Sequence, residues 1–408
     1  MKITRIETIP VRVPIKPELA IRSGRGGSHL VSPFLLVKLH TNEGIVGLGE
    51  VSCTPRWSGE DQVTAAHFIN TYFAPLLVGE SFDCSRPLRG RPEAPVDEIE
   101  RLSAKFAAAV AGNYFTKAAL EMALWDIVGK AHGKPVWEIL LAGSGEQGAG
   151  SKNSESSLLA ARSSPRVVPT KWSVSGVEPA KAAEIAAWAA TQGFSTMKVK
   201  VGIDPDGDLA RVRAVRDAVG TQVKLGVDAN GGWLTPQIAI ETIHRLCKEC
   251  DIYFAEQPVP AGDHDAMAEV RRNVSVPIIA DESVWTLEDA KILARAEAAD
   301  VFSIYIGKAG GIAPAREIAE FAQSVSIKCT IGSNLELGVG SAAMIHLALS
   351  TPGIDADTYP CDIIGPMFYE DDVLAEPLPI SGGSARLHDR PGLGVELDDE
   401  KVERFRVR

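Results

Sequence analysis

The sequence Thr196-Met197-Lys198-Val199-Lys200 decides the fold, because its alternation of polar and apolar residues is typical of a β-strand. Residues i and i+2 of a strand share a face, so Lys198 and Lys200 are expected to project side by side. Three further apolar runs each end on a carboxylate: Gly226-Val227-Asp228, Phe254-Ala255-Glu256 and Ile279-Ala280-Asp281. Two ammonium groups and three carboxylates are therefore predicted at the ends of neighbouring strands.

The spacing of the three carboxylates predicts a parallel α/β arrangement. They recur about every 25 to 28 residues, which is the length of one strand plus one helix. Helical runs separate strand-like runs near residues 167–174, 196–201, 223–228, 252–256, 277–281, 301–306, 327–332 and 354–357. This alternation is typical of a TIM-like (β/α) barrel, whose active site lies at the carboxyl ends of its strands.

The residues outside the barrel predict a second domain of the α+β type. Its strands are expected at residues 2–13 and 34–51, with a hairpin turn at residues 41–44, and its helices at 61–75, 98–111 and 116–130. Residues 22–28 are too rich in glycine for regular structure and are expected to form a loop, as are residues 52–59. We expect an N-terminal domain at 1–135, a helix end and flexible Gly/Ser-rich insertion at 136–166, the barrel at 167–359, and a segment at 360–408 that packs back on the N-terminal domain.

The composition narrows the classes of partner. The chain has 408 residues, 45% hydrophobic and 23% charged, and a formal net charge of −11, which disfavours nucleic acids and anionic membranes as partners. No apolar run approaches the roughly 18 residues of a membrane-spanning helix. Residues 1–5 lead directly into strand-like sequence without the pattern of a signal peptide, and the six cysteines are scattered. We therefore expect reduced thiols and a cytoplasmic location.

Two short motifs are set aside. Residues 143–148 match the GxGxxG pattern, but they follow a helix end and run into serine-rich sequence, whereas a dinucleotide site follows a strand and opens a helix. Cys247 and Cys250 have CxxC spacing but no second pair, so they are interpreted as buried, reduced cysteines.

The converging carboxylates Asp228, Glu256 and Asp281 predict a metal site. Each of them alone could be a helix N-cap or an ion-pair partner. Three together repel one another unless a cation lies among them, and oxygen-only ligands suit Mg²⁺, with Mn²⁺ as an alternative ion. Near such a cation, Lys198 and Lys200 are expected to lower each other's pKa, which would make a neutral lysine available as a base.

Five motifs in order resemble the enolase superfamily, in its mandelate racemase/muconate lactonizing enzyme family and closest to the muconate cycloisomerase subgroup. They are Lys-Val-Lys at 198–200, Asp-Ala-Asn at 228–230, Glu-Gln-Pro at 256–258, Ala-Asp-Glu-Ser at 280–283 and Lys-Ala-Gly-Gly-Ile at 308–312. The resemblance implies a modified, enolase-type barrel, a capping domain whose loops choose the substrate, a small carboxylate substrate, and a homo-oligomer.

The resemblance also implies roles for individual residues. Lys200 is the expected base or acid, and Lys198 its electrostatic partner. Tyr305 stands where this subgroup has a second lysine, and is a catalytic candidate whose alternative is plain barrel packing; Lys308 matches a structural or ion-pair position. The expected substrate-binding residues are Asn230, Asn334, Glu336, Arg25 and Trp57, with Arg22 and Arg56 as further specificity candidates.

The predicted function is Mg²⁺-dependent abstraction of the proton α to a carboxylate through an enediolate, with a muconate-cycloisomerase-like reaction favoured. Epimerisation needs an acid–base group on each face of the enediolate, and Tyr305 is less suited than lysine to abstract an α-proton. The alternatives are an acid-sugar or hydroxy-acid dehydratase, and after it an amino-acid or dipeptide epimerase. A barrel without catalysis is the rival from another class, but it predicts broken motifs, and the motifs here are intact.

Overall fold

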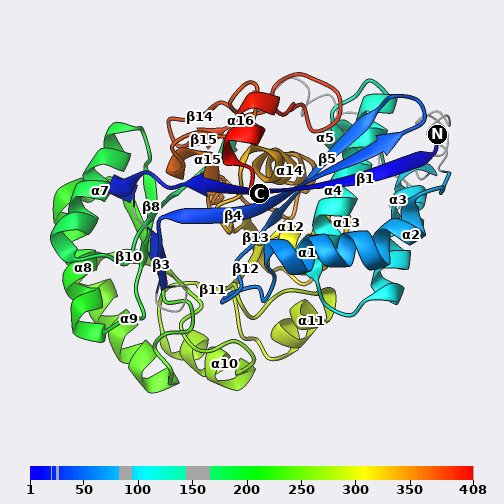
Figure 1. The fold of residues 1–408 in the computed structure, drawn as a ribbon. Helices are drawn as coiled ribbons and strands as arrows, with labels where there is room; N and C mark the ends of the chain where they lie inside the picture. The colour runs from blue at the N-terminus through cyan, green and yellow to red at the C-terminus, as the bar shows by residue number, and fades with distance from the viewer. Residues whose placement is uncertain (20, 24–26, 82–93, 144–165, 408) are drawn as a thin grey trace.

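The computed structural model describes residues 1–19, 21–23, 27–81, 94–143 and 166–407. Its N-terminal part is built on an antiparallel sheet in the order β1-β4-β5, formed by β1 (Ile3–Pro14), β4 (Val31–Thr41) and β5 (Val46–Ser52). The predicted hairpin is confirmed, because β4 and β5 pair from Phe34↔Ser52 to His40↔Val46. In Figure 1 this sheet crosses the upper part of the molecule, with the barrel below and to its left.

Helices follow this sheet in the sequence. They are α1 (Gln62–Phe68), a π-helical turn (Ile69–Phe73), α2 (Ala74–Leu77), α3 (Ala94–Ala109), α4 (Tyr114–Ala131) and α5 (Val136–Gly143). Of these, α1, α2 and α4 pack against the sheet. Helix α4 is buried along almost its whole length. It approaches β5 so closely that a Cβ at Gly49 would overlap the carbonyl oxygen of Ala119. Glycine on the strand therefore permits the contact that joins the sheet to this helix.

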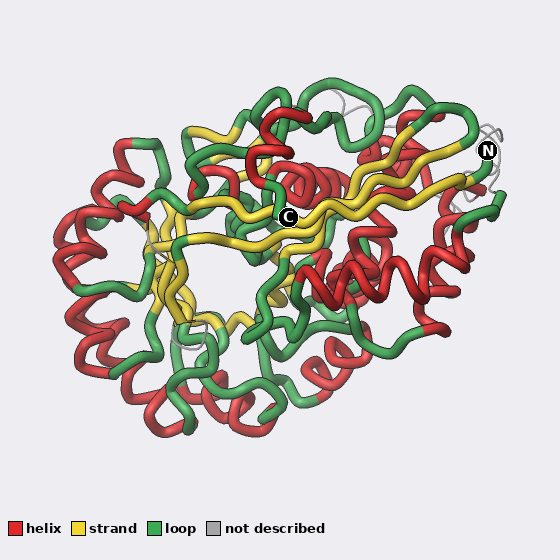
Figure 2. Tube along the Cα trace, in the orientation of Figure 1, coloured by secondary structure: helices red, strands yellow, loops and turns green. Residues whose placement is uncertain are grey.

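The second part is a parallel sheet of seven strands wrapped as a barrel. Their spatial order runs without interruption from β13 to β7, formed by β7 (Trp172–Val174), β8 (Thr196–Lys200), β9 (Lys224–Asp228), β10 (Ile252–Glu256), β11 (Ile278–Ala280), β12 (Val301–Ile304) and β13 (Lys328–Ile331). Helices surround the strands (Figures 1 and 2). They are α7 (Pro179–Thr191), α8 (Pro205–Val219), α9 (Pro236–Cys250), α10 (His264–Asn273), α11 (Leu287–Arg295), α12 (Ile306–Ala309), α13 (Ile312–Ser324) and α14 (Gly338–Ser350). The α/β fold class, with a capping domain and an enolase-type barrel, is confirmed.

The prediction of a regular eighth strand at residues 354–357 is wrong. Cys329 and Ile354 form an isolated parallel bridge, and the chain then continues irregularly. The amide of Asp362 donates to the carbonyl of Ile331 at 2.8 Å on one side, and the amide of Lys171 donates to Cys361 at 3.0 Å on the other. The segment 354–362 therefore closes the barrel through scattered backbone hydrogen bonds instead of a continuous ladder.

The end of the chain returns to the capping sheet. Helix α15 (Gly365–Phe368) follows the barrel. Strand β14 (Ile380–Ser381) pairs with β15 (Ser384–Ala385), which in turn pairs with β6 (Val168–Pro169), and α16 (Asp399–Phe405) packs on β1. The amide of Val407 donates to the carbonyl of Pro10 at 2.9 Å. In Figure 1, α16 lies just above β1.

The glycine-rich stretch at 22–28 also differs from its prediction. After the short 3-10 helix Pro17–Leu19, β2 (Ile21–Ser23) pairs antiparallel with β3 (Gly27–His29). The backbone of this hairpin is held against the barrel, because the amide of Gly176 donates to Arg22 O at 2.8 Å and the amide of Arg22 donates to Ser175 Oγ at 2.7 Å. Pairing between main chains thus overrides the low strand propensity of glycine.

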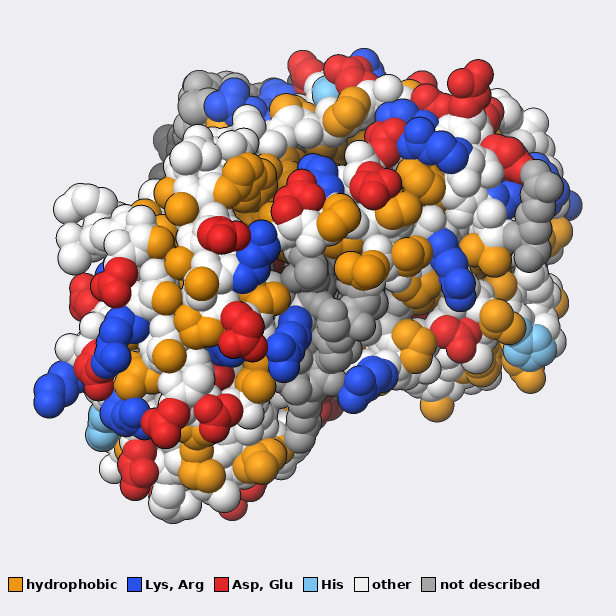
Figure 3. All heavy atoms as spheres, turned by 60° about the vertical axis from the view of Figure 1, so that its left-hand side comes forward, with side chains coloured by type: hydrophobic (Ala, Val, Ile, Leu, Met, Phe, Trp, Pro, Cys, Tyr) orange, Lys and Arg blue, Asp and Glu red, His pale blue; other side chains and the backbone are white. Residues whose placement is uncertain are grey.

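The molecular surface carries both signs of charge. Figure 3 shows acidic and basic side chains interspersed on the barrel side, with hydrophobic side chains between them. Within the described ranges, no helix combines the length and the apolar character needed to cross a membrane.

Candidate active site

Strand register lines up the central residues of the site. Lys200 is the Cα partner of Asp228 on the next strand, and Asp228 is the Cα partner of Glu256 on the strand after it. Asp281 directly follows β11, whose Ile279 pairs with Glu256. One lysine and three carboxylates therefore come from four consecutive strands at the same end of the barrel, as the spacing in the sequence predicts.

Lys198 is buried and surrounded by carboxylates. Its Nζ lies 2.8 Å from Glu256 Oε1, 2.8 Å from Asp362 Oδ2 and 3.2 Å from Asp228 Oδ2. Burial alone would lower the pKa of Lys198, but these carboxylates outweigh it and raise the pKa well above its ordinary value. Lys198 is therefore a fixed positive charge at the base of the site.

Lys200 lies closer to the cavity. Its Nζ donates to Asp228 Oδ2 at 2.6 Å and to Asn230 Oδ1 at 3.1 Å. Burial and the neighbouring Lys198 lower the pKa of Lys200. Asp228 and Glu256 raise it by a larger amount, so the net shift is upward. This upward shift comes from the charges of the chain alone, because each ammonium group faces a carboxylate as well as the other ammonium group; the lowered lysine pKa expected beside a divalent cation stays a prediction.

The three strand-end carboxylates have the chemistry of a hard-cation site. In the described part of the chain, no three His, Cys, Asp or Glu side chains are arranged so that they could hold a metal ion together. Instead, Asp228 accepts a hydrogen bond from Lys200, and Asp281 accepts hydrogen bonds from Tyr305 and Lys308. However, Glu256 Oε2 is buried and has no hydrogen-bond partner among the described residues. Burial raises the pKa of Glu256 to about 8, with Asp228 and Asp281 adding to the rise against the opposing effect of Lys198. A buried carboxylate oxygen without a hydrogen-bond partner, close to the carboxylates of Asp228 and Asp281, fits the binding of a divalent ion.

Tyr305 directly follows β12 and Lys308 lies on α12, on the side of the barrel opposite β8. The Tyr305 hydroxyl donates to Asp281 Oδ2 at 2.9 Å, and the Lys308 Nζ lies 4.2 Å from the centroid of the Tyr305 ring. Lys308 donates to Asp281 Oδ1, Asp281 O and Ser303 O at 2.6, 2.6 and 2.9 Å, which uses all three of its protons. Burial and then the charge of Asp281 raise the pKa of Tyr305 well above its ordinary value. Tyr305 is therefore a hydrogen-bond donor, and Lys308 sits behind its ring.

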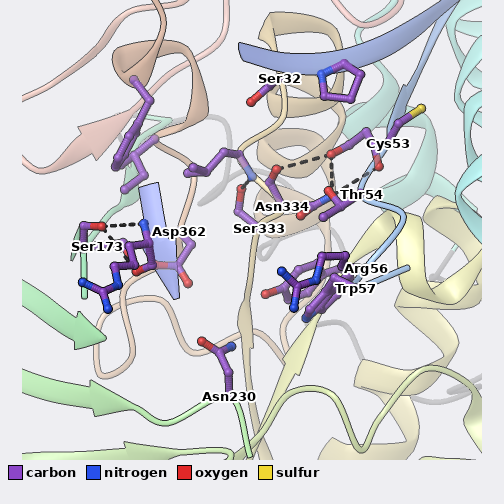
Figure 4. Close-up of a pocket in the computed structure, with 18 of the residues that line it drawn as sticks. Ser32, Cys53, Thr54, Arg56, Trp57, Ser173, Asn230, Ser333, Asn334 and Asp362 are labelled. Atoms are coloured by element: carbon purple, nitrogen blue, oxygen red, sulfur yellow. Dashed lines mark hydrogen bonds between the residues drawn. The ribbon is translucent and has the colours of Figure 1, made fainter. Parts of the chain in front are cut away.

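A cavity of about 370 Å³ lies between the capping domain and the barrel mouth. Its polar lining includes Lys198, Lys200, Asn230 and Asp362 from the barrel. Arg22 comes from β2, and Arg56 and Trp57 come from residues 52–59, which we call the capping loop. Apolar walls come from Val31, Pro33, Phe34, Leu335, Ile364 and Phe368. Figure 4 shows Arg56 and Trp57 side by side on one flank, with Asn230 below them. A volume of this size suits a small organic molecule.

The predicted substrate-binding residues differ in their relation to this cavity. Asn230, Asn334 and Trp57 line it. The amide of Asn334 is already used, because its Nδ2 donates to Thr54 Oγ1 at 2.7 Å and to Ser52 Oγ at 2.9 Å, so it ties the barrel to the capping loop (Figure 4). Glu336 is outside the cavity lining and accepts from Ser333 Oγ at 2.5 Å. Its direct contact with substrate stays a prediction.

Some predicted features fall outside the described ranges. Arg25 and the Gly/Ser-rich residues 144–165, with most of the GxGxxG match, belong to the undescribed part of the chain. Arg22 and Arg56 line the cavity.

Two carboxylates of the site, Asp362 and Glu282, were not among the residues predicted from the sequence. Asp362 lies on the irregular closing segment, accepts from Lys198, and is 3.3 Å from the buried Lys171 through its other oxygen. Glu282 follows Asp281, and its Oε1 accepts from Asn230 Nδ2 at 2.8 Å and from Trp57 Nε1 at 3.2 Å. The Asp-Glu pair at 281–282 was a usable signal for Glu282, whereas Asp362 follows no strand-like run that could have identified it.

A barrel whose mouth holds paired lysines and strand-end carboxylates beneath a capping domain has the layout of an enzyme active site. Two family models match the chain: "Enolase C-terminal domain-like" over residues 180–402 and "Mandelate racemase / muconate lactonizing enzyme, N-terminal domain" over residues 5–141. The chain belongs to the mandelate racemase/muconate lactonizing enzyme family of the enolase superfamily. It is an isomerase of the type that includes cycloisomerases, racemases and epimerases.

The relatives divide among three reactions. Muconate cycloisomerase 1 of Rhodococcus opacus is 33% identical, over 99% of this chain and 98% of that protein. The crystal structure of an N-succinyl Arg/Lys racemase from Bacillus cereus has a TM-score of 0.85 at 29% identity, covering 100% of this chain and 99% of that one. A dipeptide epimerase from Cytophaga hutchinsonii, complexed with Mg and D-Ala-L-Val, has a TM-score of 0.83 at 28% identity, covering 99% and 98%.

Proposed function

We propose that this protein is a Mg²⁺-dependent cycloisomerase that transfers one proton on one face of an enediolate, with Lys200 as the proton-transfer residue. The observation that carries the proposal is the asymmetry of the barrel mouth. Among the described residues that line the cavity, both ammonium groups come from β8. The facing position, four strands away in the sheet, holds Tyr305, whose proton is already donated to Asp281.

The asymmetry favours a reaction that needs a single acid–base group. Racemisation and epimerisation remove a proton from one face and return it to the other, so they need two such groups. In cycloisomerisation of an unsaturated diacid, one carboxylate oxygen adds to the double bond and leaves an enediolate at the other carboxylate. The carbon α to that carboxylate then takes one proton, which Lys200 is placed to donate and which solvent replaces.

The remaining residues have electrostatic and shaping roles. Asp228, Glu256 and Asp281 would hold Mg²⁺, which supplies positive charge for the enediolate oxygens. Lys198 provides a second, fixed positive charge at the cavity floor. Tyr305 and Trp57 form an aromatic wall, with their ring centroids 5.3 Å apart and their planes 22° apart. A wall of this kind excludes water from the carbon that is protonated.

Whole-chain similarity to a racemase and to an epimerase supports a second candidate, N-succinylamino-acid racemisation or dipeptide epimerisation. The same panel tests both candidates. Purified protein with MgCl₂ is incubated in deuterium oxide with cis,cis-muconate, 2-chloromuconate, N-succinyl-L-arginine and L-Ala-L-Glu. Proton NMR follows lactone formation and, for the amino-acid substrates, the loss of the α-proton signal that accompanies inversion. Lactone formation that Lys200→Ala removes is the expected result. Inversion of either amino-acid substrate without lactone formation would replace the proposal by the second candidate.

A further inference from the structure

A chain of hydrogen bonds leads from the capping domain to Lys200. Trp57 Nε1 donates to Glu282 Oε1 at 3.2 Å, and Asn230 Nδ2 donates to the same oxygen at 2.8 Å. Lys200 Nζ in turn donates to Asn230 Oδ1 at 3.1 Å. The four groups come from the capping loop and from the ends of β11, β9 and β8. The chain therefore joins a loop that covers the cavity to the group that is proposed to move the proton.

The geometry leaves Asn230 little freedom. Its backbone is in the left-handed region, with φ of 46°, which Asn tolerates better than most residues. Its backbone amide donates to Asp228 Oδ1 at 2.9 Å, so the main chain is held beside Lys200. The side-chain amide then presents its oxygen to the lysine and its nitrogen to Glu282. A change at Glu282 must therefore act on the orientation of the Lys200 ammonium group.

Trp57, at the capping-domain end of these hydrogen bonds, is held in place by packing. The ring of Trp57 stacks on Tyr305 and on Trp285, with centroid separations of 5.3 and 5.5 Å. These contacts aim its Nε1 at the Glu282 carboxylate, whose other oxygen is buried with no hydrogen-bond partner among the described residues. Among the described residues, the Glu282 side chain accepts its hydrogen bonds from Trp57 and Asn230.

We propose that Trp57 is a positioning residue, which orients Lys200 through Glu282 and Asn230 when the capping loop is seated on the barrel. The proposal rests on the proposed function of Lys200 in proton transfer, and it assigns to the capping loop a role beyond covering the substrate. Proton transfer would be efficient only with this loop in place. If Trp57 served only as a cavity wall, its ring would matter and its indole N–H would not.

The chain offers a matched pair of substitutions. Trp57→Phe keeps an aromatic ring in the stack but removes the N–H that reaches the Glu282 carboxylate. Trp285→Phe is the control, because Trp285 belongs to the same stack but its Nε1 donates to the backbone oxygen of Glu282, at 3.1 Å. A positioning effect separates the two variants, whereas a general loss of packing does not.

The first measurement needs no substrate. Protein labelled with ¹⁵N at the tryptophan indoles gives an N–H signal for Trp57, assigned by its loss in Trp57→Phe. We expect Lys200→Met and Asn230→Ala each to shift this signal and to speed its exchange with solvent by about tenfold, because each substitution breaks a link in the series of hydrogen bonds that holds the indole N–H. The Trp285 signal should stay in place in both variants. An unmoved Trp57 signal in both would overturn the proposal.

The second measurement is kinetic and uses cis,cis-muconate with MgCl₂. Trp57→Phe should lower kcat by about 10- to 100-fold, the scale of a misplaced reacting group, with KM changed far less. Glu282→Gln, which keeps an acceptor oxygen, should retain more activity than Glu282→Ala. Equal kcat values for Trp57→Phe and Trp285→Phe would contradict the proposal. If muconate is not turned over, the proposed function fails on that substrate, and the indole signals decide the positioning role on their own.

Discussion

Replacement of Glu121 tests how the capping domain is fastened to the barrel. Glu121 is buried on α4, and its carboxylate accepts from Trp125 Nε1 at 2.8 Å on its own helix. It also accepts from the amides of Ile312 and Ala313, at 2.7 and 2.9 Å, which open α13 of the barrel. One capping-domain side chain thus satisfies two N-terminal amides of a barrel helix, and Glu121→Gln and Glu121→Ala interrupt this contact to different extents.

The hydrogen bonds set the expected size of the effect. Glutamine replaces one accepting oxygen by a donor, so one buried donor loses its partner, at a cost of about 1–3 kcal/mol. Alanine leaves all three donors unpaired, so Glu121→Ala should lower the free energy of unfolding by at least about 3 kcal/mol. Urea denaturation measures both changes. Glu320→Gln is the control, because Glu320 lies on the exposed side of α13 and pairs only with Arg316 among the described residues.

The same carboxyl predicts a pH dependence. Burial raises the pKa of Glu121 from 4.5 to about 7 in the folded protein. The folded state therefore binds more protons than the unfolded state between these values, and the contribution of this group to stability falls as the pH rises through the window. Glu121→Gln lacks this titration, so its destabilisation relative to wild type should be larger at pH 5 than at pH 8. Equal stability of wild type and Glu121→Gln, or a difference that grows with pH, would refute the reasoning.

Three further predictions address the site. Asp281→Asn should raise the dissociation constant of Mg²⁺ steeply in isothermal titration calorimetry, because one of three carboxylate charges is lost; an unchanged constant would remove Asp281 from the ligand set. Lys200→Ala should abolish incorporation of solvent deuterium at the α-carbon of the product, whereas Lys308→Met should retain incorporation and lower the Tm; the opposite pattern would exchange their roles. Gly332→Ala should destabilise the protein by about 1–3 kcal/mol, because its Cβ would overlap the Tyr305 ring, and unaltered urea denaturation would show that the ring can move freely.

Much of the fold could be predicted because it depends on local periodicity. The strand–helix alternation from Val167 and the hairpin at 34–51 both follow from patterns within a few residues. The segment 354–362 has no such pattern, and its place in the barrel comes from backbone hydrogen bonds to β13 and to the chain around Lys171. Asp362 could not be recognised for the same reason, since its importance depends on where this segment closes the barrel.

The site was predictable where strand register determines it, and less so where side-chain directions do. Lys200, Asp228 and Glu256 share a row because parallel strands keep their spacing. The position of Glu336 depends on the preceding Leu335, which has φ of 57° and turns the chain without a glycine to signal it. The pKa of Lys200 depends on the balance between one lysine and several carboxylates, which no linear spacing specifies.

The central claim is that one lysine transfers one proton on one face, and the fate of solvent deuterium tests it most directly. The substrate found in the panel is converted in deuterium oxide with MgCl₂, and the configuration of the labelled α-carbon is determined by NMR. We predict label on a single face, absent in Lys200→Ala and still on that face, though formed more slowly, in Tyr305→Phe. Rapid incorporation of label into both epimers of one substrate would contradict the account and would require a second acid–base group opposite Lys200.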